Sequence, residues 1–348
     1  MFSEFDINLF LNYFNNNYKK LKNKIFFITG ATGFIGKWLL GALLLANDKF
    51  FLNLKIFILS RNPQAFKISN KYIGNHSSVT FIEGDIRKKI VMYPQIDLPK
   101  EIDYLIHAAN DITSNISPIE ILDVCINGTK NIINFAKLKK VKDFLLISSG
   151  AVYGIQPSDI QLLNENYNGT INFEDSNSLA YGLGKINSEF LVKEYSKKKF
   201  FNSKIARCFS FVGPFMAMDK HFAIGNFIRD AAEGNNINIS SDGSSIRTYL
   251  YAGELSVWLL EILINSKGDS IYNVGGSEPI SILNLAKRVA NLINPKLSVT
   301  INNSNNLSKK SNIYIPDINH IKNELNLTPT IKLDESIIKT YEWYLASK

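Results

Sequence analysis

A tyrosine and a lysine four residues apart, Tyr181 and Lys185, are the pair in this sequence best suited to acid–base chemistry. On a helix, residues at that spacing lie one turn apart on the same face, so the lysine ammonium stands beside the phenol. A neighbouring positive charge favours the phenolate, which lets the tyrosine exchange a proton near neutral pH. Ser149 follows a short apolar strand expected over residues 144–148, and its hydroxyl can hold a substrate carbonyl or alcohol between itself and the tyrosine. These three residues are therefore candidates for proton transfer to or from the oxygen of a substrate.

A strand that ends in three spaced glycines supplies the second candidate element. Residues 25–28 are β-branched or aromatic, and glycines follow at positions 30, 33 and 36. This pattern gives a tight turn, a close approach of the backbone to a pyrophosphate, and a helix packed close to the strand. The free N–H groups at the start of that helix point at the pyrophosphate. The predicted dinucleotide contacts of this turn are Gly30, Thr32, Gly33, Phe34, Ile35 and Gly36.

The type of dinucleotide depends on the end of the second strand, expected over residues 55–59. Ser60, Arg61 and Asn62 stand there, where an acidic residue would hold the ribose diol of NAD. An arginine in place of that acid favours NADP(H) as the cofactor, with NAD(H) as the alternative. In a second interpretation, Arg61 is an ordinary surface residue.

Further strands over residues 79–82, 103–107 and 144–148 alternate with helical segments. This alternation predicts an α/β fold built on a doubly wound parallel sheet, with the ligand at the carboxyl ends of the strands. Asp85 can bond an adenine amino group there, or can equally cap a helix. The other cofactor contacts expected at these strand ends are Ile86, His107, Ala108 and Ala109.

The composition is that of an ordinary globular enzyme. The chain has 348 residues, of which 45% are hydrophobic and 20% charged, so it can bury a large core. We find no secretory signal and no apolar run long enough to span a membrane, and we expect a cytoplasmic protein without a membrane partner. The two cysteines and four histidines lack the spacing of a metal site, so no metal is expected. A net charge of +8 favours an anionic substrate without requiring nucleic acid.

With these residues and motifs, the sequence resembles the extended short-chain dehydrogenase/reductase family, in the branch that acts on nucleotide sugars. The resemblance runs from about residue 25 to the C-terminus and includes residues 29–36, 148–154, 181–185, 207–214, 247–251 and 272–276. It implies a Rossmann domain over residues 25–210, to which some later segments return, and a smaller α/β substrate-binding domain over residues 211–348. Residues 1–24 are expected to add an N-terminal helical extension. The resemblance also implies a homodimer formed through two paired helices, one of which contains Tyr181.

The resemblance assigns roles to individual residues as well. It makes Ser149, Tyr181 and Lys185 the catalytic set, with Asn127 supporting the lysine through water. Arg247 matches the arginine that holds the diphosphate, a role suited to its forked donors. The implied contacts with the nucleotide-diphosphate sugar are Asn110, Ser149, Gly150, Ser210, Asn226, Arg229 and Arg247. Ser210 departs from the family pattern, which commonly has asparagine at that position.

Members of this branch reduce 4-keto sugars, epimerise C4, dehydrate the sugar or decarboxylate uronic acids. The dehydratases resemble one another in an Asp-Glu pair directly after the catalytic hydroxyl residue, and the decarboxylases carry a glutamate in the same turn. Here the two positions are Gly150 and Ala151, which cannot transfer a proton. Two interpretations remain: reduction of a 4-keto-6-deoxy sugar nucleotide by NADPH, which we prefer because of Arg61, and 4-epimerisation by tightly held NAD. A non-catalytic sugar-nucleotide-binding protein is disfavoured because the catalytic set is intact.

Overall fold

The computed structural model describes residues 2–89, 97–110, 116–169, 176–219, 222–301 and 312–348. The chain forms two compact units. The first unit comprises residues 1–152, 173–207 and 256–272, and the second comprises residues 153–172, 208–255 and 273–348. Residues 153–172 thus lie in the second unit, although the predicted first domain spans residues 25–210. The reason is visible in the bonds that residues 153–172 make within the second unit, such as the one from Tyr153 Oη to Asn273 Oδ1 at 2.8 Å.

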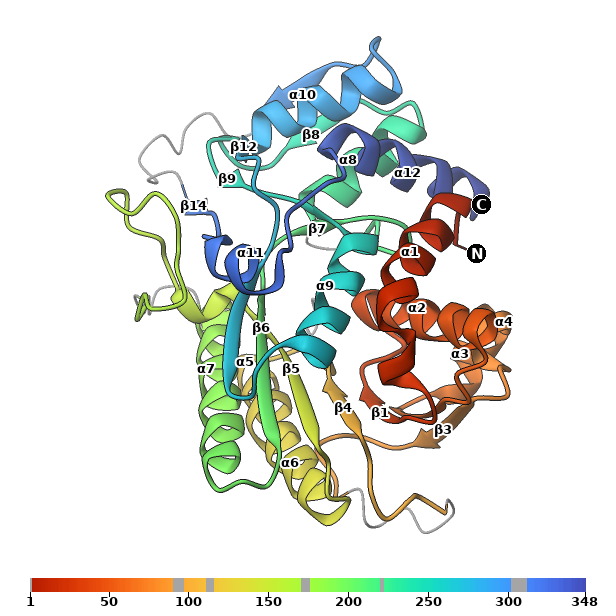
Figure 1. Cartoon of the computed structure of the whole chain (residues 1–348). Coiled ribbons are helices and arrows are strands. Elements are labelled where there is room, and N and C mark those ends of the chain that lie inside the picture. Colours follow the sequence, from red (N-terminus) through yellow and green to blue (C-terminus); the bar gives the residue numbers. More distant parts are fainter. Residues whose placement is uncertain (1, 90–96, 111–115, 170–175, 220–221, 302–311) are drawn as a thin grey trace. The chain divides into compact units, whose positions relative to one another are not determined.

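A seven-stranded sheet with the order β11-β6-β5-β4-β1-β2-β3 runs through the first unit (Figure 1). The pairs β1–β2, β2–β3, β1–β4 and β4–β5 are parallel, with Phe27 of β1 opposite Phe57 of β2 and Leu105 of β4. The chain passes from β1 to β2 and β3 on one side and then returns to β4 on the other side of β1, as in a doubly wound fold. The predicted Rossmann-type α/β fold is therefore confirmed. The strands are β1 (Ile25–Thr29), β2 (Lys55–Ser60), β3 (Val79–Glu83), β4 (Tyr104–His107), β5 (Asp143–Ser149), β6 (Asn202–Cys208) and β11 (Ser270–Val274).

Helices flank this sheet because its strands are apolar on both faces. On one face, Ile132 of α6 and Val192 of α7 share a buried cluster with Phe27, Leu105 and Phe144 of the strands. The helices of this part of the chain are α2 (Phe34–Phe50), α3 (Pro63–Ser69), α4 (Lys71–Gly74), α5 (Pro118–Asp123), α6 (Thr129–Leu138), α7 (Ser176–Lys197) and α9 (Ala252–Asn265). One turn of π-helix, Val124–Gly128, joins α5 to α6.

The predicted N-terminal helix is present as α1 (Glu4–Leu21), which begins with a capping box between Ser3 and Asp6. Its buried Phe10 packs edge-on against Trp38 of α2, with ring centroids 6.0 Å apart. On α9, Asn265 accepts a hydrogen bond from Lys20 and donates one to Asn17 at 3.0 Å. Helix α1 is thus packed as an integral part of the first unit, on the helix that follows the glycine turn.

The second unit combines short strands with helices. Its paired strands are β7 (Phe211–Val212) with β10 (Leu250–Tyr251), β8 (Ile237–Ile239) with β13 (Val299–Ile301), and β9 (Ile246–Arg247) with both β12 (Ile280–Ser281) and β14 (Ile313–Tyr314). Its helices include α8 (Ala223–Ala232), α10 (Ile282–Ile293), α11 (Asn319–Leu325) and α12 (Leu333–Ala346). Helix α10 lies along α8 and α12 and buries Leu285 and Val289.

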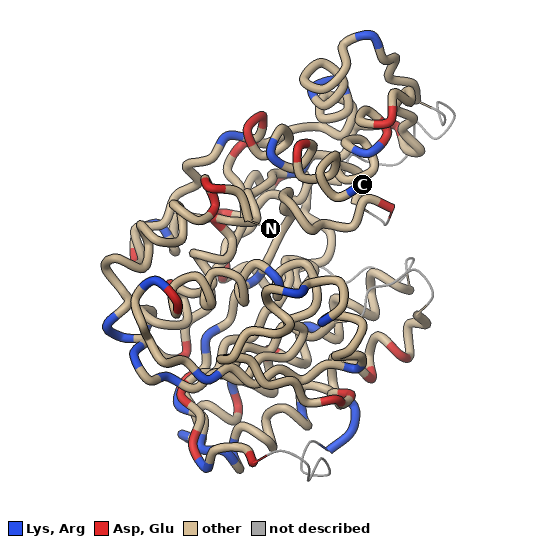
Figure 2. Tube along the Cα trace, turned by 90° about the vertical axis from the view of Figure 1, so that its right-hand side faces the viewer, with Lys and Arg blue, Asp and Glu red and all other residues tan. Residues whose placement is uncertain are grey.

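Basic and acidic residues are interspersed along the chain (Figure 2). Several lysines are paired on the surface, as Lys140 is with Glu101 at 3.2 Å and Lys197 with Glu194 at 2.6 Å. Within the described ranges, no helix has the length and apolar character needed to cross a membrane. The same residues contain no group of three or more His, Cys, Asp or Glu side chains placed to hold a metal ion.

Candidate active site

The glycine turn lies between β1 and α2 and has the geometry needed for a dinucleotide. Gly30 has φ +74°, and a Cβ there would lie 2.5 Å from the backbone of Ala108 and Ala109 at the end of β4. A Cβ on Gly36 would lie 2.2 Å from the Gly30 oxygen, so the start of α2 packs directly on the turn. Gly33 caps α2 without a side-chain hydrogen bond, and a Cβ there would meet only the Gly30 oxygen, at 3.4 Å. This open helix N-terminus, with Thr32, Phe34 and Ile35 around it, fits the pyrophosphate of a dinucleotide.

The predicted adenosine contacts at the end of β2 divide into two kinds. Asn62 accepts a hydrogen bond from the Ala65 N–H at 3.0 Å and thereby caps α3, and its own N–H donates to the buried Ser60 hydroxyl at 3.3 Å. Arg61 is exposed. The arginine is therefore the residue of this group that presents a charge outward, whereas Ser60 and Asn62 shape the start of α3.

Asp85 lies just after β3, at the predicted sheet edge, but its carboxylate is already engaged. Arg87 donates from Nη2 at 2.6 Å and from its backbone N–H at 2.9 Å, and the side-chain bond holds the pKa of Asp85 below its ordinary value. Residues 84–89 form no helix that Asp85 would cap. The next residue, Ile86, accepts a hydrogen bond from Asn131 Nδ2 at 3.0 Å. The structure thus pairs Asp85 with Arg87, and its contact with an adenine stays a prediction.

Tyr181, Lys185 and Ser149 lie on adjoining elements. Lys185 is buried in α7, and its Nζ lies 5.8 Å from the centre of the Tyr181 ring and donates to the Ile147 oxygen of β5 at 2.9 Å. The Ser149 hydroxyl, at the end of the same strand, accepts a hydrogen bond from the Ala151 N–H at 3.1 Å. A Cβ on Gly182 would lie 2.8 Å from the Ala151 oxygen, so α7 packs directly on the turn after the serine. The chain is therefore able to present a phenol, an ammonium and a hydroxyl from one helix and one strand end.

Asn127 makes a local contact at the π-turn. The side chain is exposed on the π-turn and donates from Nδ2 to Asp123 Oδ1 at 2.6 Å. The Lys185 ammonium donates to the Ile147 oxygen, and its support by Asn127 through water stays a prediction. The sequence pattern does not reveal that this segment forms a π-turn. On the same turn, Cys125 faces Gly184 of α7, and the Cys125 sulfur lies 4.0 Å from Asn110 Oδ1.

Glu189, which the sequence analysis did not select, anchors α7, the helix that carries Tyr181 and Lys185. Ser148 donates to Oε1 of Glu189 at 2.5 Å, and Arg207 of β6 donates from Nη2 to Oε2 at 2.8 Å. Glu189 therefore ties α7 to both β5 and β6. The signal in the sequence is its spacing, because Glu189 lies one helical turn beyond Lys185 on the same face of α7.

His107, predicted as a cofactor contact, is a buried residue at the end of β4. Its Nδ1 lies 2.7 Å from Thr29 Oγ1 and its Nε2 lies 3.2 Å from Thr129 Oγ1. Burial, aided by the positive charge of Lys185, lowers the pKa of His107 to about 3. The imidazole is therefore neutral at physiological pH.

The predicted sugar-nucleotide contacts of the second unit are held in different ways. Arg247 donates to the oxygens of Ile246 at 2.8 Å and Asn312 at 2.6 Å, and its guanidinium lies 5.4 Å from the centre of the Tyr314 ring. Burial lowers the pKa of Arg247, although a guanidinium stays charged. These neutral partners do not cancel the positive charge of Arg247.

Arg229, in contrast, is paired with the carboxylate of Asp230 at 2.7 Å and donates to the Met218 oxygen at 2.8 Å. Asn226 lies half-buried on the same helix, α8. The backbone oxygen of Ser210 accepts a hydrogen bond from the Leu250 N–H at 3.1 Å. Arg247 is therefore better placed than Arg229 to attract an anion.

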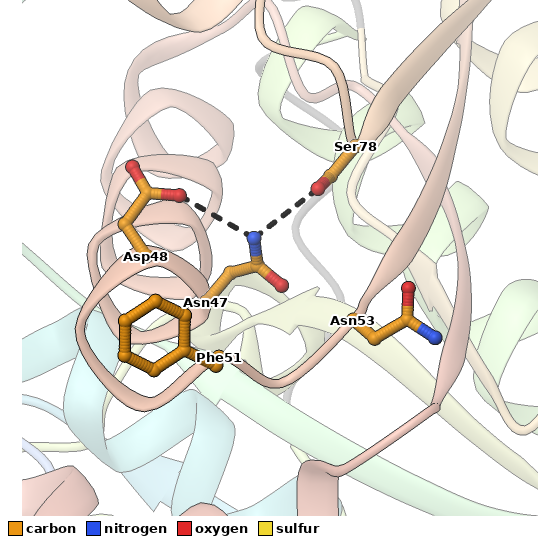
Figure 3. Close-up of a pocket in the computed structure, with 5 residues that line it drawn as sticks. All are labelled: Asn47, Asp48, Phe51, Asn53 and Ser78. Atoms are coloured by element: carbon orange, nitrogen blue, oxygen red, sulfur yellow. Dashed lines mark hydrogen bonds between the residues drawn. The ribbon is translucent and has the colours of Figure 1, made fainter.

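A shallow depression at the other end of α2 is lined by Asn47, Asp48, Phe51, Asn53 and Ser78 (Figure 3). Asn47 donates from Nδ2 to Asp48 at 3.4 Å and to Ser78 at 3.2 Å. Helix α2 has 17 residues and is about 25 Å long, so this depression is far from the glycine turn. It contains none of the residues discussed above.

A sequence model of the NAD dependent epimerase/dehydratase family matches residues 26–275, which include the glycine turn, Ser149, Tyr181 and Lys185. The chain belongs to this family. Among its relatives in the epimerase/dehydratase family, UDP-glucuronic acid decarboxylase 1 of Arabidopsis thaliana is 26% identical over 314 residues, which cover 89% of this chain and 67% of the relative. UDP-glucuronic acid decarboxylase 1 of Danio rerio is 27% identical over 323 residues, which cover 91% of this chain and 72% of the relative.

Solved structures share the fold. The UDP-N-acetylglucosamine 4-epimerase of Methanobrevibacter ruminantium, in complex with UDP-N-acetylmuramic acid, has a TM-score of 0.77 at 21% identity and covers 94% of this chain and 100% of its own. The UDP-glucuronic acid 4-epimerase of Bacillus cereus, in complex with UDP-glucuronic acid and NAD, has a TM-score of 0.76 at 21% identity. The match covers 93% of this chain and 100% of the epimerase chain. At these identities the likeness shows that this member of the epimerase/dehydratase family has the architecture of those proteins.

Proposed function

We propose that this protein is a nucleotide-sugar 4-epimerase, which oxidises and re-reduces C4 of a UDP-sugar with a dinucleotide that it retains. The observation that carries the proposal is the packing of α7 on the turn after β5. That packing holds the helix that carries Tyr181 and Lys185 on the strand that ends in Ser149, while the next two positions, Gly150 and Ala151, have no ionisable side chain. The site can therefore exchange a proton at one oxygen but has no second acid or base in this turn.

Each of the three residues has a part in this chemistry. The Tyr181 phenolate accepts the proton of the C4 hydroxyl when the sugar is oxidised, and the phenol so formed returns it when the sugar is reduced. Lys185 favours the phenolate, and its bond to Ile147 fixes the ammonium on the strand that carries Ser149. The Ser149 hydroxyl holds the sugar oxygen. When bound, the nicotinamide dinucleotide supplies the acceptor and donor of the hydride, and the glycine turn holds its pyrophosphate.

The relatives support a UDP-sugar as the substrate, since both the decarboxylases and the 4-epimerases carry UDP-sugars in their names. Decarboxylation is the activity named for the relatives by sequence. The absence of a carboxylate at Gly150 and Ala151 favours epimerisation over decarboxylation in this chain. We further propose that the second unit binds the nucleotide part of the substrate, with Arg247 as the ligand of the diphosphate.

A second candidate function rests on Arg61. An exposed arginine at the end of β2 suits the 2′-phosphate of NADPH, which would make the protein a reductase of 4-keto-6-deoxy sugar nucleotides. The two candidates share the roles of Tyr181, Lys185 and Ser149. They differ in whether the dinucleotide leaves the protein after each turnover.

We also propose that the protein forms a homodimer through α5 and α7, which pack against each other. Their outer faces carry the exposed apolar side chains of Ile119, which is 79% exposed, and Phe190, which is 61% exposed. Ile186 lies one turn before Phe190 on the same face of α7. Such a cluster of apolar side chains is suited to a partner of the same kind.

The experiment that tests the proposed function combines two readouts. The purified protein is denatured and the released dinucleotide is identified by chromatography, and the folded protein is incubated with UDP-glucose, UDP-N-acetylglucosamine and UDP-glucuronic acid. Proton NMR distinguishes a C4 epimer from the starting sugar and from a pentose formed by decarboxylation. The proposal predicts bound NAD or NADH and a C4 epimer without added cofactor. A pentose product, or turnover only with added NADPH and a 4-keto sugar, would contradict it.

A further inference from the structure

A chain of buried hydrogen bonds links the glycine turn to the catalytic helix. The Ala109 N–H donates to Thr29 Oγ1 at 3.2 Å, and Thr29 Oγ1 lies 2.7 Å from His107 Nδ1. On the other side of the ring, His107 Nε2 lies 3.2 Å from Thr129 Oγ1. Four side chains take part in this series of hydrogen bonds, and each is at most 3% exposed: Thr29, His107, Thr129 and Ser188.

This series of hydrogen bonds ends on two backbone oxygens, and that fixes which group donates in each bond of the series. Ser188 donates to the Cys125 oxygen at 2.8 Å and to the Gly184 oxygen at 3.0 Å, because a carbonyl can only accept. Ser188 must then accept its bond of 3.0 Å from Thr129, so Thr129 is a donor there and an acceptor toward His107. The neutral imidazole therefore carries its proton on Nε2, and Nδ1 accepts from Thr29.

These hydrogen bonds connect the glycine turn with helix α7, and the proposed reaction requires a fixed distance between the two. Thr29 directly precedes Gly30, and Ala108 and Ala109 pack against that glycine. Ser188 lies one turn beyond Lys185, and its bond to the Gly184 oxygen fixes the backbone next to the lysine. Cys125 belongs to the π-turn, and its carbonyl accepts the hydrogen bond from Ser188 of α7.

We propose that His107 is a positioning residue, whose Nε2–H tautomer holds the glycine turn and the Tyr181–Lys185 helix in the register that proton and hydride transfer require. This inference rests on the proposed function. His107 touches neither Tyr181 nor the sugar oxygen in this account, and it acts through Thr29 on one side and through Thr129 and Ser188 on the other. Burial keeps the ring neutral, which the two-sided bonding needs, because an imidazolium has two donors and no acceptor.

The test has one spectroscopic and one kinetic part. Nitrogen-15 NMR of the full chain labelled in histidine distinguishes the protonated from the unprotonated ring nitrogen, and His107→Gln assigns the signal. The kinetic part compares Thr129→Val, which removes the hydroxyl, with Thr129→Ser, which keeps it. Ser188→Ala is the second variant, in case Thr129→Val does not fold.

The inference predicts a proton on Nε2 near neutral pH in the wild-type protein. It also predicts that kcat falls about tenfold or more in Thr129→Val and Ser188→Ala, with KM nearly unchanged, and recovers in Thr129→Ser. A role confined to stability would lower the melting temperature but leave kcat of the folded protein unchanged, and that result would overturn the inference. A proton on Nδ1, or an imidazolium, would also overturn it. With normal turnover, a wrong tautomer contradicts only the positioning role, whereas a wild-type protein that turns over no sugar nucleotide contradicts the proposed function and the positioning role with it.

Discussion

The ammonium of Lys185 is bonded to the backbone oxygen of Ile147, two residues before Ser149 in the same strand. This contact holds the lysine of α7 to the strand that carries the serine. Its acceptor is a backbone atom, so it is present whatever side chain stands at position 147. The helix also presents Tyr181 one turn earlier, and it can approach so closely because Gly182 has no side chain. The proposed chemistry depends on this packing of α7 on β5.

Tyr181→Phe removes the phenol while keeping the ring. We expect kcat to fall by about 10²- to 10⁴-fold, because the proton of the C4 hydroxyl then has no acceptor. Dinucleotide content, measured after denaturation, should stay the same. Tyr195→Phe, also on α7, is the matched control and should keep its activity. An active Tyr181→Phe protein would exclude the tyrosine as the proton acceptor.

Glu189→Gln leaves the guanidinium of Arg207 without its carboxylate partner in a buried setting. We expect the free energy of unfolding to fall by about 3 kcal/mol, as is usual when one member of a buried ion pair is lost. Glu194→Gln, on the exposed part of the same helix, removes the pair with Lys197 and should cost at most about 0.5 kcal/mol. Equal losses in urea denaturation of the two variants would show that Glu189 does not anchor α7.

The stability of the protein should decrease as the pH falls below about 6.5, in part because of His107. The unfolded chain binds a proton on this imidazole near its ordinary pKa, whereas the folded chain binds one only near a pKa of about 3. Between these two pKa values unfolding takes up a proton. The free energy of unfolding therefore falls by at most about 1.4 kcal/mol for each unit by which the pH is lowered. His107→Phe should show a smaller dependence of the unfolding free energy on pH. An unchanged slope in a folded His107→Phe protein would contradict a buried, neutral histidine.

Arg61→Ala tests the preference for the dinucleotide. If the arginine faces a 2′-phosphate, the variant should bind NADPH about tenfold or more weakly, with little change for NADH, since an ion pair to phosphate is lost. Lys67→Ala, on α3, provides a nearby loss of charge as the control. Titration by the fluorescence of the reduced nicotinamide gives both affinities, and equal losses for the two dinucleotides would remove the support for NADP and favour the epimerase.

Ile186→Glu combined with Phe190→Glu places two charges on the outer face of α7. We expect the proposed dimer to dissociate, because burying an unpaired carboxylate at an interface is costly. Phe51→Glu changes a side chain that is 85% exposed at the end of α2 and serves as the control. Sedimentation of the wild-type protein as a monomer would contradict the proposed dimer directly.

Much of the fold was predictable, because it depends on local patterns. The apolar runs before Gly30 and Ser149 predicted buried parallel strands, and the spacing of Tyr181 and Lys185 predicted a shared helix face, as found. The α1 helix was predictable from its apolar spacing in the same way.

What the sequence did not reveal depends on contacts between distant segments. The partners of Glu189 come from two different strands, so no spacing along the chain shows them. The grouping of Tyr153 with the second unit depends on a partner, Asn273, that lies more than a hundred residues away along the chain.

The central claim is that the hydrogen removed from C4 returns to the same sugar. It is tested by incubating the protein, without added cofactor, with UDP-glucose carrying deuterium at C4, or with whichever UDP-sugar of the panel it converts, labelled likewise. The account predicts that the C4 epimer keeps its deuterium at C4 and that the protein in heavy water introduces none from the solvent. Loss of the label from C4, or its appearance in free dinucleotide, would contradict a 4-epimerase that retains its cofactor.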